Sequence, residues 1–181
     1  MDERTAHVFF FAPFVSSTMQ VEPAWIDYNG HMNMAYFHVL LDNALEEAFT
    51  QVGLGHDYLD ERGASFFTAE VHTSYKRELK LNDRVRITVQ LIDFDEKRLH
   101  YYVEIRHAED GWVAATFEGL SLHIDMSTRK TCPFPDDIRD NLSVMRAAHS
   151  RLRRPNDLGR VIGVPSRTER HERLVSTGTR H

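Results

Sequence analysis

Cysteine is almost absent from this 181-residue chain, which contains Cys132 alone. A single thiol forms no internal disulfide and supplies no pair of thiolates for a zinc site. The chain also lacks a His-Glu-x-x-His motif, a Gly-x-Ser-x-Gly nucleophile turn and a phosphate-binding loop, and its 11 histidines show no metal-ligand spacing. These absences argue against a disulfide scaffold, a metal site and a serine hydrolase, and they favour a reducing, cytoplasmic setting.

Long hydrophobic runs and an excess of positive charge are missing as well. The apolar run at residues 8–15 is too short to span a bilayer and follows an acidic N-terminus, so we expect neither a signal peptide nor a membrane anchor. The net charge of −5, with both signs interspersed, argues against a nucleic-acid partner. With 41% apolar residues the chain suffices for one well-buried core.

One segment has the periodicity of a long helix. Asn33 is a suitable N-cap, and Gly53 and Gly55 end the pattern. The neighbouring Val39 and Leu40 are also apolar, so we expect burial on more than one side. The residues recurring at helical spacing are Phe37, Leu41, Ala44, Leu45, Ala48 and Phe49.

Four later segments alternate apolar and polar residues with the period of two that is typical of strands. They lie at residues 67–75, 85–91, 99–105 and 112–124, and Gly119 is a candidate bulge in the last. An opening strand at residues 14–21 makes five. The short connections between the last four predict an antiparallel meander.

The C-terminal part changes character after the last strand. Prolines around Cys132 break the sheet, and a short helix is expected over residues 136–149. We therefore expect one domain over residues 1–150 and an arginine-rich extension over residues 151–181, partly extended or disordered, whose charges are solvated.

Polar residues gather just before the long helix, in Trp-Ile-Asp-Tyr-Asn-Gly-His-Met-Asn-Met-Ala-Tyr at residues 25–36. A helix start exposes unpaired backbone N–H groups, which stabilise an anion or a developing oxyanion. A carboxylate just upstream, Asp27, is suited to attack a carbonyl polarised there or to activate water against it. The alternative is that Asp27 only caps the turn or the helix.

The order of elements, together with Asp-x-x-Gly-His-x-Asn-x-x-Tyr from Asp27 to Tyr36, resembles the hotdog-fold acyl-CoA thioesterases of the 4-hydroxybenzoyl-CoA thioesterase type. The resemblance spans residues 14–148 and implies an α+β hotdog fold. In that fold a five-stranded antiparallel sheet wraps around one long central helix, here followed by a C-terminal helix and an extended tail. A narrower likeness, in residues 25–33 and 153–163, is to the betainyl-CoA thioesterases of carnitine degradation.

The resemblance implies hydrolysis of a small acyl-CoA thioester without a metal or a cofactor, coenzyme A being part of the substrate. Asp27 is then the nucleophile or the general base, and the backbone N–H of Met34 is the oxyanion donor. Many relatives have Asn where this chain has Met34, a change that is tolerable if the backbone is the acting group. His31 orients water, contacts the carbonyl or carboxylate, or is structural. Asn33 is a cap more than a catalyst.

Two further sets of residues are candidates for substrate binding. Aromatic faces hold quaternary ammonium groups such as that of betaine, although aromatic residues also fill cores and interfaces. Basic pairs at strand ends are candidates for the CoA phosphates, against the alternative of solvated loop charge. The acyl-group candidates are Trp25, Tyr28, Asn29, Gly30, Tyr36, Phe66, Phe67 and Trp112, and the CoA candidates are Lys76, Arg77, Arg129 and Lys130.

A sheet of this kind leaves one edge exposed and covers its helix incompletely, so we expect a homodimer or homotetramer with the site at the subunit interface.

Two alternative functions remain. Hotdog hydratases carry an Asp-x-Asn-Pro-x-His turn, which Asp27 to His31 echoes without the proline. A non-catalytic acyl-CoA binding protein is the second. The other hotdog thioesterase type, with its carboxylate in the helix, is disfavoured because Glu46 and Glu47 have no His-Gly-Gly turn before them.

Overall fold

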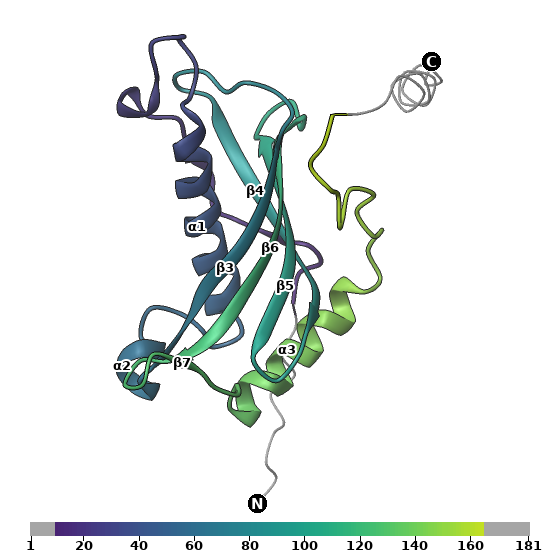
Figure 1. The fold of residues 1–181 in the computed structure, drawn as a ribbon. Helices are drawn as coiled ribbons and strands as arrows, with labels where there is room; N and C mark the ends of the chain where they lie inside the picture. The colour runs from purple at the N-terminus through teal and green to yellow at the C-terminus, as the bar shows by residue number, and fades with distance from the viewer. Residues whose placement is uncertain (1–9, 165–181) are drawn as a thin grey trace, which may run out of the picture.

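The computed structural model describes residues 10–164, and an antiparallel sheet dominates it (Figure 1). The four long strands lie in the spatial order β4-β5-β6-β3, and β3 has no neighbour on its outer side among these residues. The meander expected for all four is present in β4 to β6 but is wrong for β3, which pairs with β6 and not with β4, because the connection at residues 76–83 carries the chain from one edge of these strands to the other. Their bounds are β3 Ala64–Tyr75, β4 Arg84–Phe94, β5 Arg98–His107 and β6 Val113–Asp125. Short strands complete the sheet: β1 (Phe14–Val15) and β2 (Met19–Gln20) pair with β4, and β7 (Lys130–Thr131) pairs with β6.

The opening strand is present but interrupted. Both β1 and β2 pair antiparallel with β4, as expected for residues 14–21. Between them, the Ser16 hydroxyl accepts the Ile87 N–H at 3.0 Å. The next residue, Ser17, donates its N–H to Glu47 on the long helix at 2.7 Å. At this point side chains make hydrogen bonds that the backbone makes in a continuous strand. The strand is therefore divided into β1 and β2.

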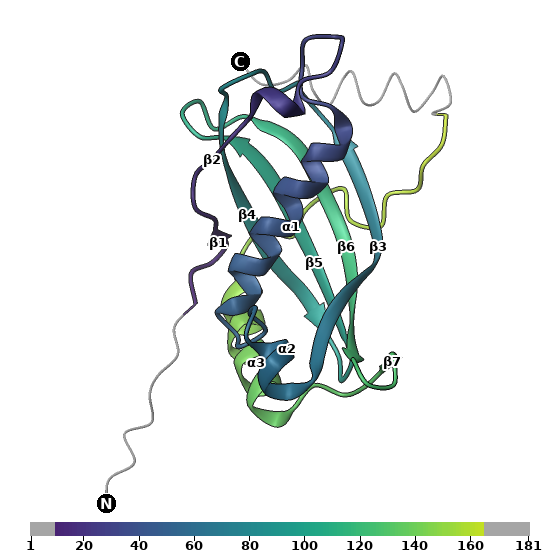
Figure 2. The same ribbon diagram turned by 90° about the vertical axis from the view of Figure 1, so that its left-hand side faces the viewer.

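The long helix α1 (Met34–Thr50) lies across one face of the sheet, as Figure 2 shows. Its N-cap is Asn33, whose side chain accepts the Ala35 N–H at 2.9 Å. All six residues predicted at helical spacing are buried, and so is Leu40. Val39 is 41% exposed, so the expectation of burial there is wrong for a single chain. Nothing between residues 10 and 164 covers the outer side of α1 at Val39.

Side chains from β4 and β5 form the sheet's contribution to the core. All eight of the residues predicted there are at most 2% exposed: Val85, Ile87, Val89, Leu91, Leu99, Tyr101, Val103 and Ile105. The edge strand β3 behaves differently, because Phe67 is 41% exposed and Tyr75 is 45% exposed. Alternation therefore predicted the strand, whereas its position at the edge decided how much of it is covered.

Gly119 is not a bulge, contrary to the expectation from sequence. It pairs in register with Val71 on one side and with Tyr101 on the other, and the irregularity in that ladder falls in β3 between Thr68 and Glu70. A Cβ at Gly119 would lie 2.6 Å from the Tyr101 hydroxyl oxygen. The glycine is needed because the Tyr101 ring crosses the backbone there.

Short helices close the ends of the core. The predicted C-terminal helix is α3 (Asp136–His149), which packs on β4 and buries Ile138, Leu142 and Met145. A short helix that the sequence did not indicate, α2 (Tyr58–Arg62), precedes β3, and a 3-10 turn, η1 (Pro23–Trp25), precedes the polar turn. After α3 the chain crosses the sheet face opposite α1 (Figure 1). No helix among the described residues is long and apolar enough to cross a bilayer.

Candidate active site

The polar segment before α1 folds as a tight hairpin. The Asp27 N–H donates to the His31 carbonyl at 3.0 Å, and the Gly30 N–H donates to the Asp27 carbonyl at 3.0 Å. Gly30 has a φ of +80°, a conformation that an L side chain rarely adopts. The Met32 N–H donates to the Leu79 carbonyl at 2.7 Å. The turn is thus fastened to the loop that follows β3.

Asp27 is held by one carboxylate oxygen and leaves the other available. Its Oδ1 accepts the Asn29 N–H at 2.8 Å, so the carboxylate does cap the turn, as the alternative interpretation of Asp27 expected. Its Oδ2 accepts no hydrogen bond from any described residue, and the side chain is 14% exposed. The carboxylate is therefore oriented by the turn, while one of its oxygens has no hydrogen-bond donor among the described residues.

Met34 opens α1 and supplies a free donor. The side chain of Asn33 caps the Ala35 N–H, which confirms Asn33 as the N-cap and leaves the Met34 N–H without an acceptor in residues 10–164. The Met34 side chain is 62% exposed. An unpaired N–H at the positive end of a helix dipole is the kind of group that stabilises an oxyanion.

The predicted aromatic residues do not gather in one place. Trp25 and Tyr36 stack beside the polar turn, with ring centroids 5.4 Å apart and planes at 13°. Tyr28 projects from the turn and is 98% exposed. Phe66 packs edge to face on Phe49 near the start of β3, so one chain does not bring it to the Trp25–Tyr36 stack.

Trp112 contacts other residues, and within one chain it does not join the Trp25–Tyr36 stack. Its ring stacks on His107 at 4.9 Å, and the guanidinium of Arg77 lies 4.2 Å from its centroid. The indole N–H donates to Asp110 at 3.2 Å. Trp112 therefore stabilises the turn between β5 and β6 and positions Arg77.

The two predicted basic pairs lie at opposite ends of the sheet. Lys76 and Arg77 follow β3 at the end where α1 begins, whereas Arg129 and Lys130 lie at β7, near α2 (Figure 1). Lys76 is already paired, since its ammonium lies 3.4 Å from Asp157. A single chain thus cannot bring all four cations to one phosphate group.

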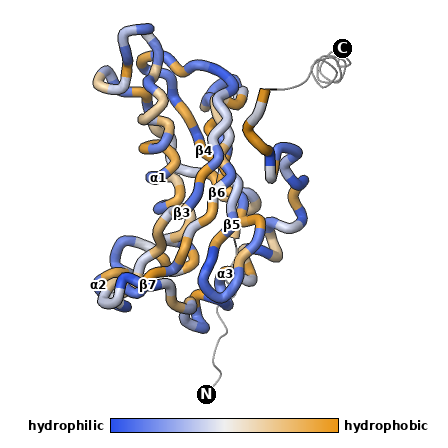
Figure 3. Tube along the Cα trace, in the orientation of Figure 1, coloured by the Kyte–Doolittle hydropathy of each residue, from blue (hydrophilic) through white to orange (hydrophobic). Residues whose placement is uncertain are grey.

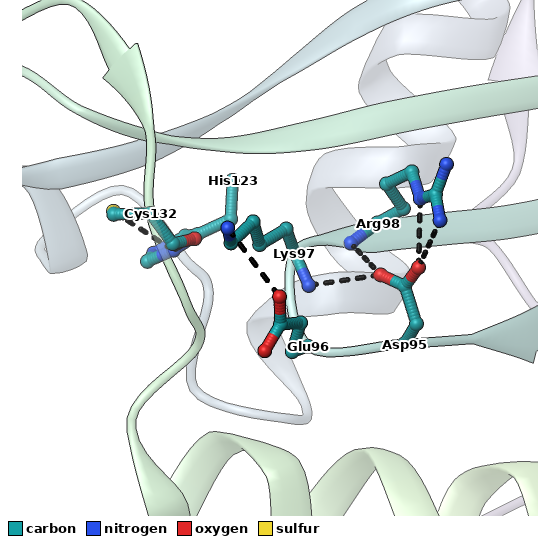
Figure 4. A network of polar contacts seen from close by, with 6 residues as sticks. All are labelled: Asp95, Glu96, Lys97, Arg98, His123 and Cys132. Atoms are coloured by element: carbon teal, nitrogen blue, oxygen red, sulfur yellow. Dashed lines mark hydrogen bonds and ion pairs between the residues drawn. The ribbon is translucent and has the colours of Figure 1, made fainter.

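A buried polar cluster around His123 was missed from the sequence (Figure 4). Its Nδ1 lies 2.9 Å from the Cys132 carbonyl and 3.3 Å from the Cys132 sulfur, and its Nε2 lies 3.0 Å from the Tyr58 hydroxyl. Burial lowers the pKa of His123 and raises that of Cys132, and it raises the pKa of Tyr58 to about 12. A neutral imidazole beside a protonated thiol indicates a structural cluster.

Asp157 was missed as well, because nothing in an arginine-rich tail singles it out. It accepts hydrogen bonds from the Tyr102 hydroxyl at 2.6 Å, from Thr116 at 3.2 Å and from Lys76 at 3.4 Å. Burial by itself would raise the pKa of Asp157, but the Tyr102 hydrogen bond and the Lys76 charge outweigh it and hold the pKa below its usual value. Asp157 anchors the C-terminal segment to the outer face of the sheet.

No three His, Cys, Asp or Glu side chains between residues 10 and 164 gather as a metal site would require. The turn and the helix start supply the reactive groups of the candidate site. They comprise a carboxylate with a free oxygen, a free backbone N–H and an imidazole, next to stacked aromatic rings. This set is suited to acyl transfer from an activated ester.

Fold and site together define a class. A long helix held against an antiparallel sheet, with an aspartate on the turn before the helix, is the arrangement of the hotdog-fold thioesterases, which are thioester hydrolases. The sequence profile of the thioesterase-like superfamily matches residues 21–142, and the chain belongs to this family.

Individual relatives agree with this class. The betainyl-CoA thioesterase of Pseudomonas aeruginosa is 32% identical over 145 residues, covering 80% of this chain and 91% of the relative. The L-carnitine dehydrogenase/betainyl-CoA thioesterase of Rhizobium meliloti is 34% identical over 144 residues, and this chain spans 29% of its length. A Staphylococcus aureus protein solved in complex with CoA superposes with a TM-score of 0.78 at 27% identity, covering 87% of this chain and 99% of that one.

Proposed function

We propose that this protein hydrolyses acyl-CoA thioesters and that betainyl-CoA, yielding betaine and CoA, is its preferred substrate. The observation that carries the proposal is the pairing of a half-free carboxylate at Asp27 with a free N–H at Met34 on the turn and first residue of α1. The two relatives named for betainyl-CoA hydrolysis support the choice of acyl group. The Rhizobium relative is much longer than this chain, so the proposal extends to its thioesterase activity and not to its dehydrogenase activity.

In the proposed reaction the thioester oxygen accepts the Met34 N–H, and the charge that develops on it is stabilised at the helix start. Asp27 Oδ2 then either attacks the carbonyl carbon or removes a proton from an attacking water molecule. The first route expels CoA thiolate and leaves a mixed anhydride that water hydrolyses. Both routes consume one water and release a carboxylate and CoA, and neither needs a cofactor beyond the CoA of the substrate.

We assign His31 an orienting role. Its Nδ1 lies 3.3 Å from the Met32 carbonyl, to which it donates, so Nε2 is the nitrogen that remains for a ligand. The side chain is 36% exposed. In the proposal Nε2 contacts water or the thioester group, while Asn29 and Gly30 shape the turn that the substrate meets.

The Trp25–Tyr36 stack is the proposed contact for the trimethylammonium group of betaine. A quaternary ammonium has no N–H to donate, so it is held by aromatic faces. Trp25 lies two residues before Asp27, and Tyr36 lies in the first turn of α1. This position of the stack suits an acyl group whose carbonyl oxygen is bound by the Met34 N–H. Tyr28, exposed on the same turn, is available to close the site from the other side.

We further propose that two copies of the chain complete the site by pairing along β3, as a dimer or within a tetramer. Support comes from the free edge of β3, from exposed Phe67 and Tyr75, and from Val39 on the uncovered side of α1. Antiparallel pairing of two β3 strands sets the start of one beside the end of the other.

This pairing explains the positions of residues that one chain leaves apart. At the start of β3 lie Phe66 and Phe67, which would meet the partner's polar turn. At the same end of the sheet lie Arg129 and Lys130, which would meet the CoA phosphates. Lys76 and Arg77 would contribute from the turn's own chain. A cytoplasmic location completes the proposal, supported by the one free thiol at Cys132 and by a CoA thioester as the substrate.

A thiol-release assay tests the proposal. Betainyl-CoA, an aromatic acyl-CoA and a straight-chain acyl-CoA are compared with wild type and with Asp27→Asn, using Asp60→Asn on α2 as the matched control. We expect betainyl-CoA to be the fastest substrate and Asp27→Asn to lose about 100-fold or more in kcat. Equal rates for wild type and Asp27→Asn would refute the mechanism. Hydration of an enoyl-CoA without thiol release would identify a hydratase instead.

A further inference from the structure

The segment after α3 crosses the outer face of the sheet strand by strand. Leu152 to Pro155 line a cavity with Thr88 and Gln90 of β4. Asp157 then hydrogen-bonds Tyr102 of β5 and Thr116 of β6. The segment therefore runs roughly across the strands, from β4 towards β6, and its course is fixed by specific contacts.

The next contacts carry the segment to the free edge. The Gly159 N–H donates to Glu118 of β6 at 2.6 Å, and Glu118 pairs in register with His72 of β3. Gly159 and Arg160 also line a cavity of about 510 Å³ on this face, whose other lining residues include members of all four long strands. In Figure 2 the segment passes behind the sheet and emerges beyond β3.

The residues after Gly159 are long enough to reach past the edge of this chain's own sheet. Three extended residues cover about 10 Å, which is about two strand spacings of roughly 4.8 Å. Counted from Gly159 on β6, one spacing reaches β3 and the second reaches the position of a strand added to its edge. The chain up to Ile162 can therefore reach the position that a partner's β3 would take.

The residues that extend past the edge are apolar. Val161 is 87% exposed, Ile162 84% and Val164 92%, and Figure 3 shows this end of the described chain as hydrophobic although it lies away from the sheet. Three exposed aliphatic side chains close together are costly in water unless another surface covers them. Since the same segment is firmly attached at Asp157 and Gly159, its direction is set before the apolar run begins.

We propose that residues 161–164 form an arm that lies on the outer sheet face of a second copy of this chain, across two β3 edges. Each copy gives one arm and receives one. The arm rests on the dimer proposed above and not on the hydrolytic activity. It makes the C-terminal segment part of the assembly that builds the active site.

Cross-linking between differently tagged chains tests the arm directly. In a Cys132→Ser background, one chain carries Ile162→Cys and the other carries His72→Cys, and the co-expressed pair is treated with a short bismaleimide. We expect a covalent product that contains both tags. Val144→Cys on α3, also an exposed aliphatic position, replaces Ile162→Cys as the control and should give no such product.

The outcomes separate the arm from the proposed function. Intact dimers that release thiol but yield no product with both tags would overturn the arm and leave the hydrolase standing. The arm is equally overturned if Ile162→Cys and His72→Cys react only when placed on one chain, because the segment then folds onto its own sheet. Cross-linking without thiol release would instead support the arm and count against the hydrolase.

Aspartate substitutions give a second measurement. With Val161→Asp and Ile162→Asp together in the full chain, we expect the dimer dissociation constant to rise about tenfold or more, because burying a charge is unfavourable. Val144→Asp is the matched control and should leave it unchanged. An unaltered dissociation constant for the double variant, in a chain that remains folded, would contradict the proposal.

Discussion

The Nδ1 atom of His31 lies 3.9 Å from Oδ2 of Asp27, beyond hydrogen-bond distance. That nitrogen instead donates to the neighbouring Met32 carbonyl, and the carboxylate is oriented by the Asn29 N–H. Asp27 and His31 therefore share a turn without forming a proton-sharing pair. The carboxylate depends on the backbone, not on the imidazole, for its position.

Replacing His31 tests this separation. We expect His31→Asn to lower kcat less than Asp27→Asn does. The reason is that the carboxylate is oriented by the Asn29 N–H and makes no hydrogen bond to the imidazole. Thiol release by both variants, measured at one pH beside wild type, checks this, and a loss in His31→Asn as large as that in Asp27→Asn would show that the two groups act as a unit.

Trp25 is expected to control which acyl group is preferred. Removing its ring in Trp25→Ala eliminates one face of the stack with Tyr36, so the ratio of kcat/KM for betainyl-CoA over a neutral acyl-CoA of similar size should fall about two- to fivefold. Trp25→Phe, which keeps an aromatic face, should retain most of the preference. If Trp25→Ala leaves the ratio unchanged, the ammonium group does not bind at this stack.

Gly119 should be intolerant of even a methyl group. In Gly119→Ala the new Cβ would overlap the buried Tyr101 ring, and we expect the free energy of unfolding to fall by about 1–3 kcal/mol. Urea denaturation of Gly119→Ala, Tyr101→Leu and the double variant checks the cause. Because the two positions are in contact, the double variant should lose less than the sum of the single losses. Strict additivity would assign the effect to something other than the ring.

His149 makes stability depend on pH. Its Nδ1 accepts the Leu91 N–H at 2.8 Å and its Nε2 donates to the Phe11 carbonyl at 2.9 Å. The buried ring is therefore neutral, and both of its nitrogens are hydrogen-bonded. Burial lowers the pKa of both His149 and His123. The unfolded chain thus binds more protons below about pH 6.5, and stability falls as the pH drops through that value.

Urea denaturation midpoints measured between pH 8 and pH 5 check this expectation. Stability should be level above about pH 7 and decline below about pH 6.5. Carboxylates with lowered pKa values, such as Asp157, lose their contribution only near and below pH 4 and do not affect this window. His149→Gln should be less stable at neutral pH and show a shallower decline. An unchanged slope in that variant would remove His149 as a source of the effect.

Local patterns were sufficient for α1, for the four long strands and for the helix after the sheet, but not for α2. The spacing from Phe37 to Phe49 and the alternation in β4 and β5 predicted α1 and the buried sheet face, because a side chain's period is set by its own backbone. Asn33 was recognised as the N-cap for the same reason, since a cap bonds residues within one turn. The expected helix over residues 136–149 matches α3.

Contacts between residues far apart in the sequence could not be predicted and are seen only in the tertiary structure. Trp112 is joined to Arg77, Asp157 to Tyr102, and His123 to Tyr58, across 35, 55 and 65 positions respectively. The exposure of Phe67 and Tyr75 follows from strand order, which places β3 at the edge. Periodicity indicates which side chains of a strand share a face. It does not indicate which other strand is the neighbour, because strand pairing is decided by the packing of the whole chain. The polar turn was therefore visible in the sequence, while the residues that surround it depend on the fold.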